Sequence, residues 1–131
     1  MFIDQTGGAK MKRIEEFTRG GKNFVYIDFS GLQTNEEISR LIEQAKLTIH
    51  KNSPKSIYTI TNFERLHFNK ESKDLVVPYT ESNKPYVIAG AIIGMDGLKK
   101  VMATTIFSLS GRKDLAILSS KEEAIQHLLD L

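Results

Sequence analysis

The sequence predicts an α/β protein: a mixed, mostly parallel sheet that is opened by an antiparallel hairpin and covered by about four helices. Three observations lead to this fold class. A Gly-Gly pair separates two β-rich runs near the N-terminus, amphipathic helical segments then alternate with short apolar runs, and residues 87–94 are uncharged throughout. Alternation of this kind calls for a parallel sheet whose strands are joined by right-handed crossovers.

Size and composition indicate one domain. The 131 residues suffice for a single hydrophobic core, and 40% hydrophobic with 26% charged residues is the balance of a globular protein. We expect residues 1–10 to be a flexible leader and residues 11–131 to be the domain. The chain has no Cys, which excludes disulfides and Cys-based metal sites.

Charge and hydropathy restrict the environment and the partners. The formal net charge is only +2, which does not favour nucleic acid as a partner. No apolar stretch reaches the length that a membrane-spanning helix needs, and no signal-peptide segment is recognisable. We therefore expect a cytoplasmic protein without an integral membrane segment.

The first half of the chain predicts a hairpin, a helix and a strand. Residues 14–17 and 24–29 flank the Gly-Gly pair, which supplies the positive φ angles of a tight hairpin. Thr34 and Glu37 have the spacing of a capping box, and apolar residues follow at helical spacing. Residues 55–61, rich in β-branched side chains, then predict a strand that this helix connects to the hairpin.

The middle of the chain predicts a second helix and a central strand. Asn69 is expected to cap a helix from Lys70 to about Tyr79, with Pro78 kinking or ending it. Residues 87–94 form the best candidate for a parallel strand buried on both faces. Within this run we expect the first glycine to permit close packing and the last to allow a sharp exit.

The end of the chain repeats the strand–helix pattern. Asp96 is expected to cap a helix that ends at Ser110-Gly111. Residues 115–118 then predict a short strand, and Ser120 with Glu123 has the spacing of a second capping box before a terminal helix.

The C-terminal half carries a resemblance to a known family. An apolar strand leads into the helix DGLKKVMATTIFSLSG, followed by a short strand and SSKEEAIQHLLDL. This order resembles the ending of SpoIIAA-like proteins of the STAS/SEC14-type class, and the similarity in element order extends over roughly residues 14–131. Because its motifs are hydrophobic patterns with few fixed residues, the resemblance implies the fold more than the function.

The family's phosphorylation motif is not found here. In the STAS anti-sigma antagonists, the strand after the first helix leads to an Asp-Ser-Ser-Gly type loop whose Ser is phosphorylated by a partner kinase. The equivalent loop, residues 61–69, contains neither Ser nor Gly. Ser72 follows, but we expect it to be a solvent-facing helix residue. The resemblance therefore implies no phosphorylation switch.

Catalytic and metal-binding motifs are likewise missing from the sequence. The histidines, His50, His67 and His127, have no partner at metal-ligand spacing. Neither a glycine-rich phosphate loop nor a GxSxG elbow occurs. We therefore predict a protein that is not an enzyme and that has no cofactor or metal. The basic residues around the third helix, Arg112 among them, could form a basic patch, but the lysines are interpreted as the solvated side of that helix.

The first functional hypothesis is a regulatory or binding domain that acts through protein–protein interaction, with a homodimer left open. Its surface would be the loop and helix around residues 61–72. Loops beyond the carboxyl ends of parallel strands are a characteristic place for binding sites. The candidate binding residues are Thr61, Asn62, His67, Asn69 and Ser72.

Two alternatives remain open. The SEC14-like side of the resemblance implies a carrier of a small apolar ligand, held under the helix that contains Leu75, Val76 and Tyr79, with Pro78 marking a movable lid. An enzyme would instead require His67, Asn69 and Asp96 to converge in one pocket.

Overall fold

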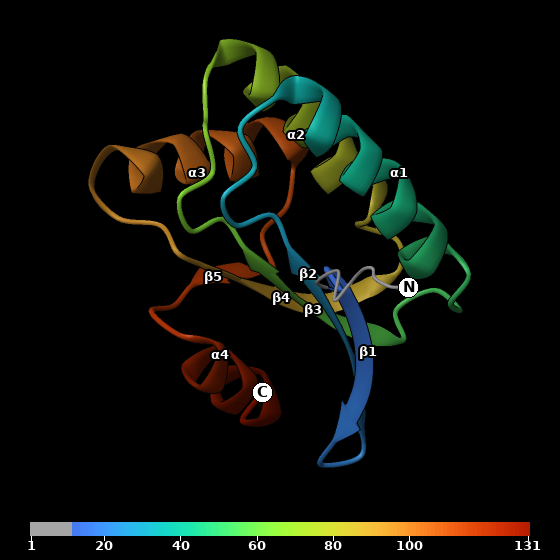
Figure 1. Cartoon of the computed structure of the whole chain (residues 1–131). Helices are drawn as coiled ribbons and strands as arrows, with labels where there is room; N and C mark the ends of the chain where they lie inside the picture. The colour runs from blue at the N-terminus through green and yellow to red at the C-terminus, as the bar shows by residue number, and fades with distance from the viewer. Residues whose placement is uncertain (1–11) are drawn as a thin grey trace, which may run out of the picture.

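The computed structural model describes residues 12–131, with the exception of the Leu98 side chain (Figure 1). The expected leader, residues 1–10, lies outside the described residues. The elements are, in chain order, β1 (Ile14–Arg19), β2 (Lys22–Asp28), α1 (Asn35–His50), β3 (Ile57–Asn62), α2 (Lys70–Ser82), β4 (Val87–Ile93), α3 (Gly97–Ser110), β5 (Leu115–Ile117) and α4 (Lys121–Leu129).

The predicted fold class is confirmed. The five strands form one sheet in the order β1-β2-β3-β4-β5, in which β1 and β2 are antiparallel and the remaining neighbours are parallel. Right-handed crossovers between consecutive neighbouring strands place their helices on the same face of a sheet. Accordingly, α1, α2 and α3 lie together on one face, and α4 lies alone on the other (Figure 1).

The sheet separates two hydrophobic cores. Along β2, Val25 and Ile27 belong to the larger core beneath α1–α3, whereas Phe24 and Tyr26, which alternate with them, face the smaller core beneath α4. This alternation follows from the two-residue period of a strand. Phe24 also stacks on Phe17 of β1, with ring centroids 5.0 Å apart. The hairpin therefore covers the part of the smaller core that α4 is too short to reach.

The local signals at the first turn and the first helix behave as expected. Gly20 and Gly21 have φ angles of 60° and 77°, so the hairpin uses the backbone freedom of both. The Thr34 hydroxyl accepts a hydrogen bond from the Glu37 amide, and the Glu37 carboxylate accepts one from the Thr34 amide, both at 3.1 Å. The hydrogen bonds that its carboxylate accepts from the Gln33 amide and from the Thr34 amide lower the pKa of Glu37.

The prediction that Pro78 ends or kinks the second helix near Tyr79 is wrong about the end, because α2 continues to Ser82. Pro78 lies on the exposed side of the helix, while Val76 and Tyr79 are buried on the other side. Only the carbonyl of Asp74 loses its helical N–H donor at Pro78. Packing of the buried side therefore outweighs the loss of one hydrogen bond.

The two later capping predictions are only half right. Asp96 is the N-cap residue of α3, but its side chain makes no capping hydrogen bond. Ser120 caps α4 by accepting from the Glu123 amide at 3.1 Å, whereas the Glu123 carboxylate accepts from the Ser119 hydroxyl at 2.6 Å. The Ser119 amide also donates to this carboxylate, at 3.2 Å, so Ser119 takes the place of the Ser120 amide as donor in the capping box. These bonds from Ser119 lower the pKa of Glu123.

Gly90 in β4 and Gly94 directly after it allow neighbouring segments to approach closely, because glycine has no side chain. A Cβ on Gly90 would lie 2.6 Å from Oγ1 of Thr59 and 2.8 Å from the Leu115 side chain. Gly94 has a φ of 82°, and a Cβ there would lie 2.7 Å from Cα of Glu64. Both expectations for these glycines are confirmed. The loop that follows β3 therefore rests directly on the end of β4.

We predict that Gly94→Ala destabilises the protein more than Gly31→Ala does. Both glycines have positive φ angles, 82° and 73°, so both variants lose about 1–2 kcal/mol to backbone strain. Only the new methyl group at position 94 meets other atoms, which adds about 1–3 kcal/mol. Urea unfolding of the two variants measures the difference, and equal losses would contradict the proposed contact with Glu64.

Candidate functional site

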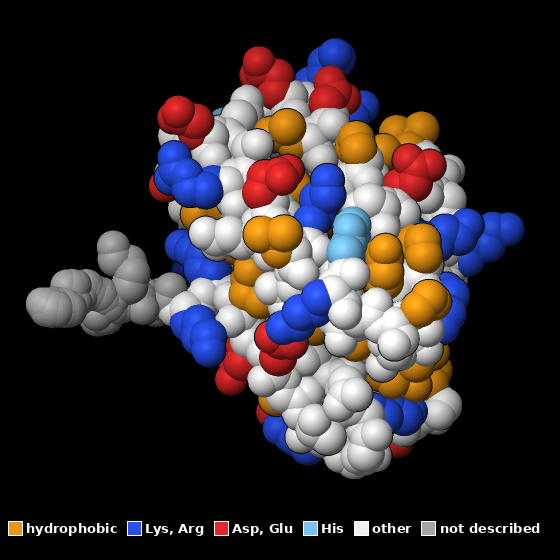
Figure 2. Space-filling view, turned by 90° about the vertical axis from the view of Figure 1, so that its right-hand side faces the viewer, with side chains coloured by type: hydrophobic (Ala, Val, Ile, Leu, Met, Phe, Trp, Pro, Cys, Tyr) orange, Lys and Arg blue, Asp and Glu red, His pale blue; other side chains and the backbone are white. Residues whose placement is uncertain are grey.

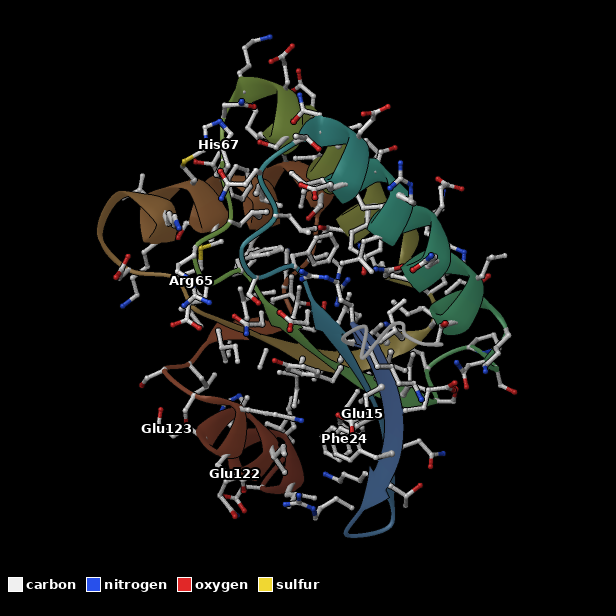
Figure 3. The ribbon with its side chains drawn as sticks, in the orientation of Figure 1. Glu15, Phe24, Arg65, His67, Glu122 and Glu123 are labelled. Carbon is white, nitrogen blue, oxygen red and sulfur yellow. The ribbon has the colours of Figure 1, made fainter. Side chains whose placement is uncertain are left out.

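The candidate site is the loop between β3 and α2, at the carboxyl ends of the parallel strands. Phe63 and Leu66 are buried, with 4% and 2% of their surface exposed, and anchor the loop in the larger core. Glu64, Arg65 and His67 are exposed. Arg65 and His67 lie on the same side of the molecule (Figure 3). We refer to the exposed side chains of Glu64, Arg65 and His67 as the β3–α2 loop surface.

Hydrogen bonds to neighbouring segments hold this loop in one conformation. The amide of Gly31 donates to the carbonyl of Glu64, and the amide of His67 donates to the carbonyl of Leu32, both at 3.0 Å. The Glu64 amide donates to Oδ1 of Asn62 at 2.9 Å. The loop is thus tied both to the segment before α1 and to the end of its own strand.

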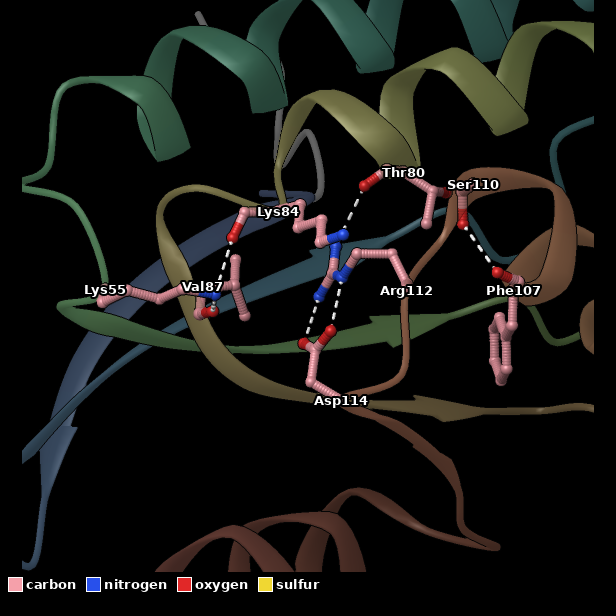
Figure 4. A network of polar contacts seen from close by, with 8 residues as sticks. All are labelled: Lys55, Thr80, Lys84, Val87, Phe107, Ser110, Arg112 and Asp114. Carbon is pink, nitrogen blue, oxygen red and sulfur yellow. Dashed lines mark hydrogen bonds and ion pairs between the residues drawn. The ribbon is translucent and has the colours of Figure 1, made fainter.

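Arg65 has a φ of 57°, in the left-handed region that non-glycine residues rarely adopt. This conformation costs about 1–2 kcal/mol for a residue with a Cβ. Lys55 is also left-handed, but its Nζ donates to the carbonyls of Lys84 and Val87 at 3.0 and 3.1 Å (Figure 4). The Arg65 side chain is 71% exposed, and within residues 12–131 it forms a single ion pair, with Glu64 at 3.3 Å. The left-handed backbone of Arg65 closes a tight turn, in which the Leu66 amide donates to the Phe63 carbonyl at 3.1 Å, while its side chain stays exposed.

The five candidate binding residues do not form one surface. Thr61 is buried on the α1–α3 side of the sheet. The Asn62 side chain accepts a hydrogen bond from the Glu64 amide and donates one to the Tyr26 hydroxyl. Asn69 and Ser72 form a reciprocal capping box at the start of α2, with bonds of 2.7 and 2.9 Å.

The expectation that Ser72 faces solvent is wrong, because none of its surface is exposed. Its hydroxyl occupies the third position of the capping box and turns back toward Asn69. Of the five candidates, His67 is therefore the one that joins the β3–α2 loop surface. Glu64 and Arg65 were not among them, although two charged residues between two apolar ones are a signal for a turn with buried anchors.

Arg112 is buried and therefore does not contribute to a basic surface patch around α3. Only 5% of its surface is exposed. Nε and Nη2 donate to the two carboxylate oxygens of Asp114 at 2.7 and 2.5 Å, and Nη1 donates to the carbonyl of Thr80 at 3.0 Å (Figure 4). The paired guanidinium therefore links the segment before β5 to α2.

Close to this ion pair lies a small space between the sheet and helices α2 and α3, which we call the Tyr79 cavity. Its polar lining includes Thr59, Thr61, Tyr79 and Arg112, and a volume of about 20 Å³ is open to the centre of a water molecule. Small-molecule sites usually offer about 300–1,000 Å³. This cavity therefore has no room for a ligand of that size.

The residues named for an apolar ligand do not form a pocket. Tyr79 lines the cavity, whereas Val76 is fully buried in the core and Leu75 packs against that core. Burial raises the pKa of the Tyr79 hydroxyl, which keeps it a neutral hydrogen-bond donor.

The three residues named for an enzyme do not converge either. His67 and Asn69 approach each other at 3.5 Å on the exposed side of the loop, and Asp96 has no hydrogen bond to either of them in the described part of the chain. Within residues 12–131, no group of three or more metal-ligating side chains is placed to hold an ion.

The surface around α1 is neither mainly charged of one sign nor mainly hydrophobic. Figure 2 shows acidic and basic side chains interspersed with hydrophobic ones on this face. Leu47 is the most exposed large hydrophobic residue of α1, at 76%. Single exposed apolar residues are common on soluble proteins and do not by themselves mark a site. None of the described helices combines the length and apolarity needed to cross a bilayer.

No known family model matches this chain, and no curated protein matches it closely enough to indicate a relative. The candidate site therefore rests on the geometry of the described residues.

We predict that Arg65→Gly makes the protein more stable than Arg65→Ala by about 1 kcal/mol. Both variants remove the exposed side chain, but only glycine adopts the left-handed backbone without the Cβ penalty. Urea unfolding compares them under the same conditions. Equal stabilities would show that the backbone at this position is not held in the left-handed region.

A second stability prediction concerns the buried ion pair. Asp114→Asn should cost about 3 kcal/mol, because it leaves the buried guanidinium of Arg112 without its counter-charge. Glu15→Gln, which disrupts the exposed 3.1 Å ion pair with Lys121, should cost less than about 1 kcal/mol. The midpoints of urea unfolding of the two variants measure these losses of stability. Similar losses would mean that the Arg112 charge is solvated.

Proposed function

We propose that the protein is a non-catalytic binding domain of SpoIIAA-like type, and that a protein partner docks on the β3–α2 loop surface. The observation that carries the proposal is the left-handed conformation of Arg65. Residues held in the left-handed region are concentrated at functional sites, because selection for binding can maintain a conformation that stability alone would not.

The rigidity of the loop supports this proposal. Phe63 and Leu66 are buried on either side of Glu64 and Arg65, and hydrogen bonds from Gly31 and to Leu32 fix the backbone. A loop that is already ordered loses little conformational entropy when it binds. The strain is thus present in the free protein, and the partner meets a preformed surface.

The chemistry of Arg65 indicates what the partner presents. A guanidinium binds a carboxylate through two parallel hydrogen bonds, and arginine is enriched among the residues that dominate binding energy. The present ion pair between Arg65 and Glu64 is exposed, so exchanging it for a partner's carboxylate costs little. We therefore infer a partner that places an Asp or Glu against Arg65.

The resemblance to SpoIIAA-like proteins agrees with a role in protein–protein interaction, since that class includes regulatory partners of other proteins. The proposal does not include a phosphorylation switch, because residues 61–69 contain no Ser. A second copy of the chain is one partner that meets the chemical requirement.

A photocrosslinking experiment tests the proposal. A photoreactive amino acid replaces either Arg65 or Glu43, an exposed residue of α1 that lies away from the loop, and the protein is irradiated in cells. We expect a discrete adduct of higher mass from position 65 and none from position 43. Mass spectrometry identifies the partner, and an adduct of twice the chain mass identifies a homodimer.

Affinity measurements with the captured partner complete the test. Replacing Arg65 by Ala should weaken binding about tenfold, the loss expected for one charge-assisted contact of about 1.5 kcal/mol. Glu43→Ala serves as the matched control and should leave the affinity unchanged. Adducts that form equally at both positions would argue against a specific surface at the loop.

A further inference from the structure

The Tyr79 cavity contains an unsatisfied polar group. The Tyr79 hydroxyl is inaccessible to bulk solvent and lies within hydrogen-bonding geometry of none of the described residues. Asn83, a polar residue of the same lining, pairs through Oδ1 with His50 at 3.1 Å. Burying a hydroxyl without a partner costs about 1–3 kcal/mol. Buried polar atoms are nearly always paired with protein or with ordered water, so this hydroxyl requires an explanation.

A second group at the same cavity has unused hydrogen-bonding capacity. Arg112 presents five N–H donors, and three hydrogen bonds to Asp114 and Thr80 are formed in the described structure. Tyr79 and Arg112 both line the cavity. An acceptor placed between the helices and the sheet would satisfy both residues.

Charge and volume determine what this acceptor is. Asp114 already neutralises Arg112, so the site has no excess positive charge that would favour an anion. The open volume is about 20 Å³, and a single water needs about 10–15 Å³ on the same measure. A neutral ligand of one heavy atom fits, and a larger one does not.

We propose that the Tyr79 cavity is a binding site for one structural water molecule, which hydrogen-bonds to the Tyr79 hydroxyl and to polar atoms of the sheet and Arg112. Thr59 and Thr61 of β3 also line the cavity and offer hydroxyl groups. The water connects α2, β3 and the segment before β5. The polar residues of the lining are numerous enough to supply the two to four partners that buried waters usually have.

The site also lies beneath the β3–α2 loop surface. Phe63, which anchors that loop, lines the cavity together with Thr61. The water thus fills space below the anchor and supports its position. This inference does not depend on the proposed function, because it concerns the folded chain by itself.

A crystal structure of the full chain at high resolution provides the direct test. We expect one isolated density peak within about 2.7–3.2 Å of the Tyr79 hydroxyl and of at least one further polar atom of the cavity. A hydroxyl that instead bonds directly to Asn83, with no peak in the cavity, would overturn the proposal.

The thermal stability of Tyr79→Phe gives an independent test through its sign. If the water is bound, the variant loses one of its hydrogen bonds and Tm falls by about 2–5 °C. If the hydroxyl has no partner, its removal relieves a buried unsatisfied group and Tm rises. Tyr86→Phe, at a half-buried tyrosine outside the cavity, is the matched control and should change Tm by less than about 2 °C. A higher Tm for Tyr79→Phe alone would refute the water site.

Discussion

The sequential strand order is the constraint on which the rest of the structure depends. Because right-handed crossovers join neighbouring parallel strands, α1, α2 and α3 must all lie on one face of the sheet. The opposite face is left to α4, which has only nine residues. Lys22 of the hairpin holds the end of α4 by donating to the carbonyls of Leu128 and Leu129, at 2.9 and 3.3 Å. At the start of α4, Lys121 lies over the Tyr26 ring and pairs with Glu15. The hairpin and α4 therefore stabilise each other.

The same topology explains why the candidate site lies where it does. All strand-to-helix connections of the parallel strands leave the sheet at one edge, so residues distant in the chain meet there. The loop after β3 is held between Gly94, which admits the backbone of Glu64, and the amide of Gly31, which binds the Glu64 carbonyl. Contacts with the end of β4 on one side and with the segment before α1 on the other therefore fix the conformation of the loop.

The elements that could be predicted from sequence are those governed by local chemistry. The paired glycines, the capping box of Thr34 and Glu37 and the uncharged run of β4 each have one favoured structure, and the described residues show it. The failures involve contacts between distant segments. Pro78 stays within a helix because the opposite side of α2 is buried, and Arg112 is buried because the Thr80 carbonyl, 32 residues away, accepts from it. A single sequence contains no sign of either contact.

The candidate site shows the same limit most clearly. Its position beyond β3 follows from the order of elements, but the conformation of Arg65 does not, since arginine has no preference for positive φ. Phe63 and Leu66, three residues apart, are both buried while the chain reverses between them, and Arg65 takes the left-handed turn. Glycine there would relieve the strain but would present no charged group. An arginine in place of glycine here agrees with the proposed role of its side chain in binding, and Phe63, which anchors the loop, packs against the Tyr79 cavity.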